Sequence, residues 1–139
     1  MIQVRAVPRK LALVAMLALM AAPAACGGGD DGDASQAVRD FVQATNERDG
    51  DRLCGDLLTQ EYLEQATGAT GDQAEEACKQ QLGLVTGLKL RLVSIGKTKV
   101  DGDHATVRAT IATGGQRTPR VFELAKEDGS WKLVGGTSE

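Results

Sequence analysis

The chain has 139 residues, of which 42% are hydrophobic, 25% charged and 3% aromatic, and its formal net charge is −3. This composition excludes a collagen-like, coiled-coil or disordered protein and fits a single domain. The acidic balance gives no support for a nucleic-acid partner. Three cysteines are too few for a small scaffold held together by disulfides.

The first 25 residues predict a secretory signal peptide. Arg5, Arg9 and Lys10 form a basic start without any acid, and residues 11–25 carry no charge. A basic segment, a short apolar segment and small residues before a cleavage point are typical of such a leader. The apolar run is shorter than the roughly 20 residues that a membrane-spanning helix needs. We therefore expect residues 1–25 to be removed on export, which changes the net charge from −3 to −6.

Cys26 is the predicted site of lipid attachment. It ends the sequence Ala-Pro-Ala-Ala-Cys, which resembles the lipobox of bacterial lipoproteins, where the cysteine becomes the N-terminus and its sulfur carries diacylglycerol. Pro23 departs from the usual aliphatic residue, and cleavage after Ala24 by ordinary signal peptidase is the alternative. Glycine and aspartate dominate the next residues, so we expect residues 26–33 to form a flexible acidic tether. The expected location is the outer face of the bacterial cytoplasmic membrane.

Residues 34–139 are expected to form the domain, which begins with helices. Apolar residues recur at helical spacing from Ala34 to Arg48, and a glycine between two aspartates then breaks the pattern. Three further helical segments are expected. The last of them begins with Asp72 and Glu75, which have the spacing of a capping box. These segments cover residues 53–58, 59–66 and 72–82.

After Gly87 the apolar period changes to two, which predicts antiparallel strands. Ser94 is the one polar side chain that we expect among the inward positions of the first two strands, and Gly96 predicts a bulge. Trp131 is expected in the core, facing Phe122 across a strand pair. The strands are expected over residues 88–93, 104–111, 120–125 and 131–134. The apolar inward positions of the first two are Leu88, Leu90, Leu92, Ala105, Val107, Ala109 and Ile111.

Two short motifs carry a resemblance to a known superfamily. Val100 to Val107 reads V-D-G-D-H-A-T-V, and Asp128 to Leu133 reads D-G-S-W-K-L. With the helices before them, these motifs resemble the nuclear transport factor 2-like superfamily over about residues 34–135, and more narrowly its small actinobacterial lipoproteins. The resemblance implies an α+β fold, a cone-shaped roll with N-terminal helices packed on a curved four-stranded antiparallel sheet around an apolar pocket. A cystatin-like arrangement of helix on sheet is the structural alternative.

Cys54 and Cys78 are predicted to form a disulfide. Lipidation of Cys26 leaves this even pair in an oxidising compartment, where thiols are readily joined. The bond would join the second helical segment to the helix over residues 72–82. A redox or metal-binding pair is the alternative, but the chain has no C-x-x-C spacing and only one histidine. We therefore expect no metal and no cofactor.

No catalytic residue is predicted. The resemblance brings in ketosteroid-isomerase-like and SnoaL-like enzymes, which use an Asp or His base inside the cone, but the expected inward positions hold no ionisable side chain. His104 is expected to be exposed, and Tyr62 either places a hydroxyl at a pocket mouth or packs its ring. We expect a non-enzymatic domain that binds a small apolar ligand or an envelope protein partner. An isomerase-like or cyclase-like enzyme and a structural homodimerisation module are the alternatives.

Charge is divided unevenly along the mature chain. Residues 26–80 carry 13 acids and 4 bases, whereas residues 81–139 carry 6 acids and 9 bases. Five bases are expected on the outward face of the first two strands. They form either a solvated face or a docking face for anionic lipid headgroups, wall polymer or an acidic partner. These five are Lys89, Arg91, Lys97, Lys99 and Arg108.

Overall fold

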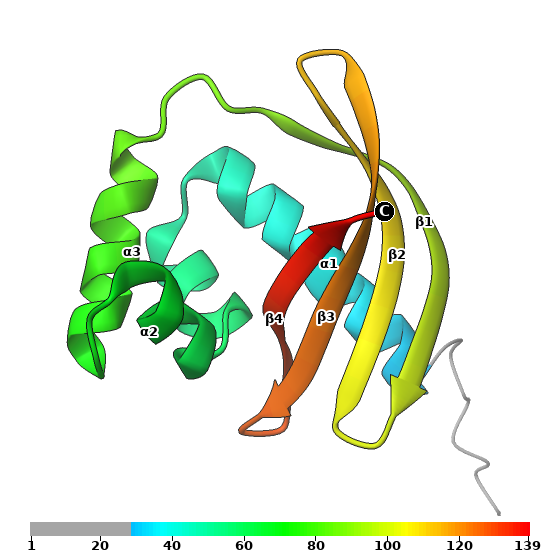
Figure 1. Cartoon of the computed structure of the whole chain (residues 1–139), viewed down its shortest axis with the longest axis horizontal. Helices are drawn as coiled ribbons and strands as arrows, with labels where there is room; N and C mark the ends of the chain where they lie inside the picture. Colours follow the sequence, from blue (N-terminus) through cyan, green and yellow to red (C-terminus); the bar gives the residue numbers. More distant parts are fainter. Residues whose placement is uncertain (1–28) are drawn as a thin grey trace, which may run out of the picture.

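A computed structural model describes residues 29–139 as a helical layer on one antiparallel sheet. The helical layer consists of α1 (Gly29–Glu47), the π-helix η1 (Asp51–Leu57), α2 (Gln60–Thr67) and α3 (Asp72–Leu84). The sheet has the order β1-β2-β3-β4 and consists of β1 (Leu90–Asp101), β2 (His104–Thr113), β3 (Gln116–Glu127) and β4 (Ser130–Ser138). Figure 1 shows α1 crossing behind the curved sheet, with α2 and α3 beyond β4. The predicted α+β roll is confirmed.

Helix α1 begins five residues earlier than expected, at Gly29 rather than Ala34. The predicted tether over residues 26–33 is therefore wrong in its second part. Asp30 lies in the first turn, where a carboxylate is stabilised by the helix dipole, and its Oδ1 pairs with the ammonium of Lys126 at 3.1 Å. Because this partner comes from a distant strand, the glycine and aspartate composition gave no sign of it.

The other helix boundaries follow local capping chemistry. Thr59 precedes α2 and its hydroxyl accepts a hydrogen bond from a backbone N–H in the first turn, and Gly68 ends the helix in the left-handed conformation. The capping box expected at Asp72 and Glu75 is not formed. Asp72 is already helical, and Glu75 pairs instead with Lys79 at 2.8 Å.

The register of β1 corrects two of the expected inward positions. A bulge between Leu92 and Ser94 moves Ser94 to the outer face, where it is exposed opposite Thr110. Leu88 lies before β1 and is 38% exposed. A second irregularity, between Ile95 and Thr98, confirms the predicted bulge at Gly96. The remaining expected inward positions are buried or half-buried, namely Leu90, Leu92, Ala105, Val107, Ala109 and Ile111.

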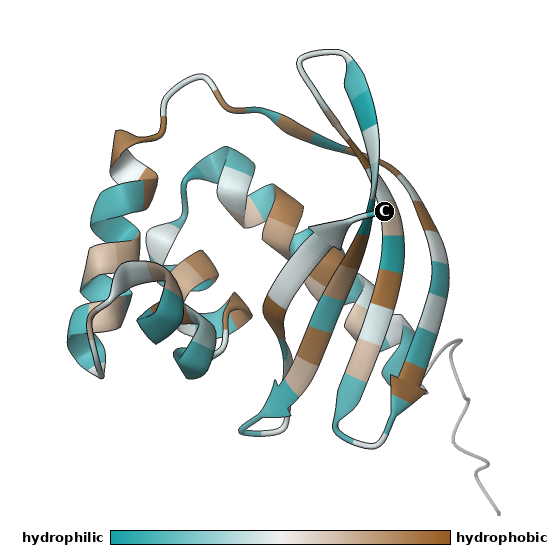
Figure 2. Cartoon of the chain, viewed as in Figure 1, coloured by the Kyte–Doolittle hydropathy of each residue, from teal (hydrophilic) through white to brown (hydrophobic). Residues whose placement is uncertain are grey.

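The core lies between α1 and the inner face of the sheet. Side chains of Phe41 and Phe122 pack with their ring centroids 6.0 Å apart, and Figure 2 shows the alternation of hydrophobic and hydrophilic residues along β2 and β3. Trp131 is buried as expected, but its cross-strand partner is Lys126, whereas Phe122 faces Gly136. The short turn between β3 and β4 sets this register, and the predicted pairing of Trp131 with Phe122 is wrong.

One side chain joins the end of α1 to the start of β1. Asn46 donates a hydrogen bond from Nδ2 to the carbonyl of Leu90 at 2.7 Å, and its Oδ1 accepts one from the N–H of Leu90 at 2.8 Å. The side-chain amide thus replaces a strand neighbour at the edge of the sheet. Among residues 29–139 no helix is long and apolar enough to cross a membrane.

Candidate functional site: a pocket inside the cone

A pocket of about 250 Å³ lies between the helical layer and the inner face of the sheet. Most of its wall is apolar, and every layer of the fold contributes to it. The apolar side chains include Phe41 from α1, Leu58 from the segment after η1, and Ile111, Phe122 and Leu133 from the sheet. This is the arrangement that the resemblance implied, a cavity enclosed by a curved sheet and the helices packed on it.

Three polar side chains also line the pocket, namely those of Tyr62, Thr113 and Arg120. Arg120 pairs across the sheet with Ala109 and with Ser138. Side chains alternate along a strand, so Arg120 lies on the same face as Phe122, two residues further on. Arg120 is exposed whereas Phe122 is buried, which places the guanidinium at the solvent end of the pocket.

The pocket carries an uncompensated positive charge within the described part of the chain. Its lining there includes no Asp, Glu or His. Two arginines of residues 29–139 are paired, Arg52 with Asp40 at 2.9 Å and Arg108 with Glu139 at 3.3 Å, but Arg120 forms no ion pair there. The site can therefore enclose apolar groups and offer one cation at its open end, and its lining also includes two hydroxyl groups.

Gly136 leaves room in the pocket wall contributed by β4. It stands opposite Phe122, and a Cβ built on it would lie 3.5 Å from Cδ1 of that ring, an ordinary contact. A larger side chain at this position would extend into the cavity. The pocket therefore depends on a glycine that the backbone conformation does not itself require, since no positive φ occurs there.

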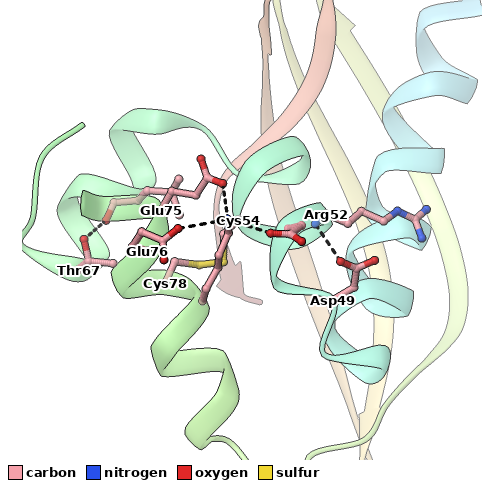
Figure 3. The surroundings of a disulfide bond; sticks show 10 residues. Asp49, Arg52, Cys54, Thr67, Glu75, Glu76 and Cys78 are labelled. Carbon is pink, nitrogen blue, oxygen red and sulfur yellow. Dashed lines mark hydrogen bonds and ion pairs between the residues drawn. A yellow bond between two sulfur atoms is a disulfide. The ribbon is translucent and has the colours of Figure 1, made fainter. Parts of the chain in front are cut away.

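The predicted disulfide between Cys54 and Cys78 is confirmed and joins η1 to α3 (Figure 3). Close packing surrounds it, because a Cβ on Gly55 would stand 3.3 Å from Oε1 of Glu75. Lys79 of α3 pairs with Glu75 of the same helix at 2.8 Å and with Asp51 of η1 at 2.9 Å, so it also links the two helices. The hydrogen bonds from Lys79 to these two carboxylates raise the pKa of its ammonium. The cross-link holds η1, which leads directly into Leu58 of the pocket wall, against α3, and we assign it a structural role.

The five predicted basic residues are all exposed. Three of them lie on the outer face of the sheet by register. Of the other two, Lys89 precedes β1 and its ammonium donates a hydrogen bond to the carbonyl of Asn46, and Lys97 lies in the second bulge. One of the three, Arg108, is engaged by Glu139, and docking by this face stays a prediction. The three on the outer face are Arg91, Lys99 and Arg108.

The remaining candidates lie away from the pocket. His104 is exposed on the outer face, where it lines an open groove of about 620 Å³ with Lys99 and Glu123. The lipidation site predicted at Cys26 falls outside the described residues. From residue 29 to the C-terminus, no group of three or more His, Cys, Asp or Glu side chains is arranged to hold a metal ion.

Sequence reasoning found Tyr62 but missed Arg120 and Gly136. The expected inward set covered only the first two strands, so β3 and β4 were left without assigned faces. The sequence did contain a signal for Arg120. The apolar residues Phe122 and Leu124 indicate which positions of β3 face inward, and the same alternation places Arg120 inward.

Solved structures that resemble this one decide the fold. A nuclear transport factor 2-like protein of unknown function from Silicibacter pomeroyi superposes with a TM-score of 0.51 at 16% identity, covering 80% of this chain and 97% of that one. A nuclear transport factor 2-like protein from Cytophaga hutchinsonii gives a TM-score of 0.52 at 17% identity, covering 75% and 92%. The chain has the nuclear transport factor 2-like fold.

A third similar structure comes from a protein of unknown function of Mycobacterium tuberculosis. Its TM-score is 0.54 at 16% identity, with 83% of this chain and 76% of that chain covered. No protein-family model and no curated protein matches the sequence. At such low identities the likeness establishes the nuclear transport factor 2-like fold, which is the fold that the two sequence motifs implied, and it leaves the function to be argued from the site.

Proposed function

We propose that this protein is an exported, lipid-anchored protein of the bacterial cell envelope whose domain binds a small apolar ligand without transforming it. The observation that supports binding is the pocket of about 250 Å³ with a largely apolar wall. Concave sites of this kind, with a few polar groups at fixed positions, are where proteins usually hold small molecules.

The lining of the pocket favours binding over proton-transfer chemistry. An isomerase-like enzyme needs a base whose pKa lies near the working pH. The lining of the described pocket includes no Asp, Glu or His, the side chains that most often act as such a base.

The start of α1 sets the geometry that an anchor at Cys26 would have. Only three residue steps separate Cys26 from Gly29, the first helical residue, and three extended residues span at most about 10 Å. The domain would therefore stand directly on the membrane surface. The acyl chains and the folded domain would act as one peripheral unit.

Binding in the pocket is tested by filling it. Gly136→Leu places a branched side chain beside Phe122, whereas Thr137→Leu adds an apolar side chain at the next position, which faces outward opposite Val121. Titration calorimetry with octanamide on the chain from residue 26, carrying Cys26→Ser, is expected to show binding by the unfilled protein and by Thr137→Leu. Gly136→Leu is expected to lose about tenfold or more in affinity. Equal affinities in all three proteins would place the ligand elsewhere.

The anchor has its own test. Mass spectrometry of the protein extracted from membranes is expected to show a chain that begins at a diacylglyceryl-modified Cys26. Cys26→Ala is expected to move the protein from the detergent phase to the aqueous phase in phase separation. An unmodified chain that begins at Ala25 would instead establish cleavage by ordinary signal peptidase.

A further inference from the structure

We propose that the pocket selects a carboxylate with an apolar body of about eight heavy atoms, and that Arg120 binds the carboxylate. This inference rests on the proposed function, because it specifies which ligand the pocket accepts. It follows from the charge of the pocket, from the geometry of β3 and from the volume enclosed.

The charge of the pocket favours an anion. Arg120 is the one charged side chain that lines it in the described chain. Ser138 lies opposite Arg120 on β4, and the next residue is the acid Glu139. The carboxylate of Glu139 pairs with Arg108 on the outer face and not with Arg120. A guanidinium beside apolar walls gains most from a partner that supplies a negative charge, and its planar donors match the two oxygens of a carboxylate.

The position of Arg120 fits an amphiphile whose charged end meets solvent. Arg120 is exposed, while Phe122 and Leu133 deeper in the same pocket are buried. A carboxylate bound at the guanidinium would stay partly hydrated, and its apolar body would extend inward along these side chains. Such placement avoids the large cost of burying an ion pair completely.

The lining of the pocket also contributes two hydroxyl groups. Tyr62 and Thr113 line the pocket together with Arg120. In the described chain the backbone N–H of Tyr62 is used in capping α2, whereas its phenol has no hydrogen-bond partner. A hydroxyl donor of this kind suits the oxygen atoms of a carboxylate and supports the same ligand class.

The volume sets the length of the apolar body. At about 30 Å³ for each water-sized group, a cavity of about 250 Å³ holds about eight groups. Octanoate meets this size, with its carboxylate placed at the open end. Octanamide has the same shape and number of heavy atoms but no charge, which makes it the matched neutral probe.

The experiment measures octanoate and octanamide binding by titration calorimetry on the chain from residue 26 with Cys26→Ser. Octanoate is expected to bind about tenfold or more tightly than octanamide, which corresponds to one hydrogen-bonded charge pair. Arg120→Gln is expected to remove this preference, so that octanoate and octanamide bind with similar affinities. Arg117→Gln is the matched control, because Arg117 lies on the same strand but pairs with Ala112 on the outer face. Thermal unfolding of each variant confirms that it is folded.

Each contrary result has a separate meaning. Equal affinity of the unsubstituted protein for both probes would overturn the role of Arg120 and leave binding in the pocket intact. An equal loss of the octanoate preference in Arg120→Gln and Arg117→Gln would mean that the preference reflects general electrostatic attraction. That result would also overturn the role of Arg120 in binding the carboxylate. Binding of neither probe would overturn the proposed binding function together with this inference.

Discussion

Replacing both Cys54 and Cys78 with alanine is expected to lower the free energy of unfolding by about 3.5 kcal/mol. The disulfide joins residues separated by 24 positions. For a loop of this length, removing the bond returns about 12 cal/mol/K of entropy to the unfolded chain, which is about 3.5 kcal/mol at 25 °C. The described part of the chain, residues 29–139, has an unfolding entropy of about 0.23 kcal/mol/K. The melting temperature should therefore fall by about 15 °C.

Thermal unfolding followed by circular dichroism measures this change. The comparison uses the oxidised protein, the double alanine variant and the oxidised protein after reduction, all with Cys26→Ser so that no third thiol exchanges with the bond. Reduction alone should reproduce most of the loss, because it opens the loop without removing buried atoms. A fall of less than about 4 °C would refute the reasoning. It would mean that residual structure already restricts this segment in the unfolded ensemble.

Three further perturbations test the fold and its surface. Asn46→Ala should cost about 1–3 kcal/mol in urea unfolding, because Leu90 loses both partners of its backbone groups, and an unchanged midpoint would contradict that role. The backbone N–H of Gly71, followed by the side chain of Gln60, lowers the pKa of Glu64, so its contribution to stability is present above pH 4.5 and is lost as the pH falls below that value. Glu64→Gln should flatten this part of the stability profile, and an unaltered profile would assign the acid sensitivity elsewhere. Reversing the charges of three of the five predicted basic residues, Lys89, Arg91 and Lys97, should weaken binding to vesicles that contain anionic lipid, and unchanged binding would mean that these exposed side chains are only solvated.

The layout of the sheet was predictable because alternating apolar residues and turn glycines in the sequence indicate its strands and turns. Burial alternates along β2 as the sequence does, and the turn glycines Gly102 and Gly129 adopt positive φ, where other residues are strained. The beginning of α1 was not predictable in this way. Its first turn gains a partner when Lys126, 96 residues away, reaches Asp30. The glycine and aspartate composition reports only the local helix propensity of this segment and not the stabilisation by a distant residue.

The pocket shows why the site was harder to predict than the fold. Its space comes from the curvature of the sheet and from Gly136, and neither is visible as a motif. Arg120, however, illustrates a usable rule. Side chains alternate along β3, so the inward position of Phe122 places Arg120 inward as well. Burying an unpaired guanidinium in a core would cost a large free energy of desolvation. An inward arginine without an acid beside it therefore predicts that its strand position opens to solvent. In a cone-shaped fold that position lies at the mouth of the cavity. A positive charge there favours a ligand with a negative charge.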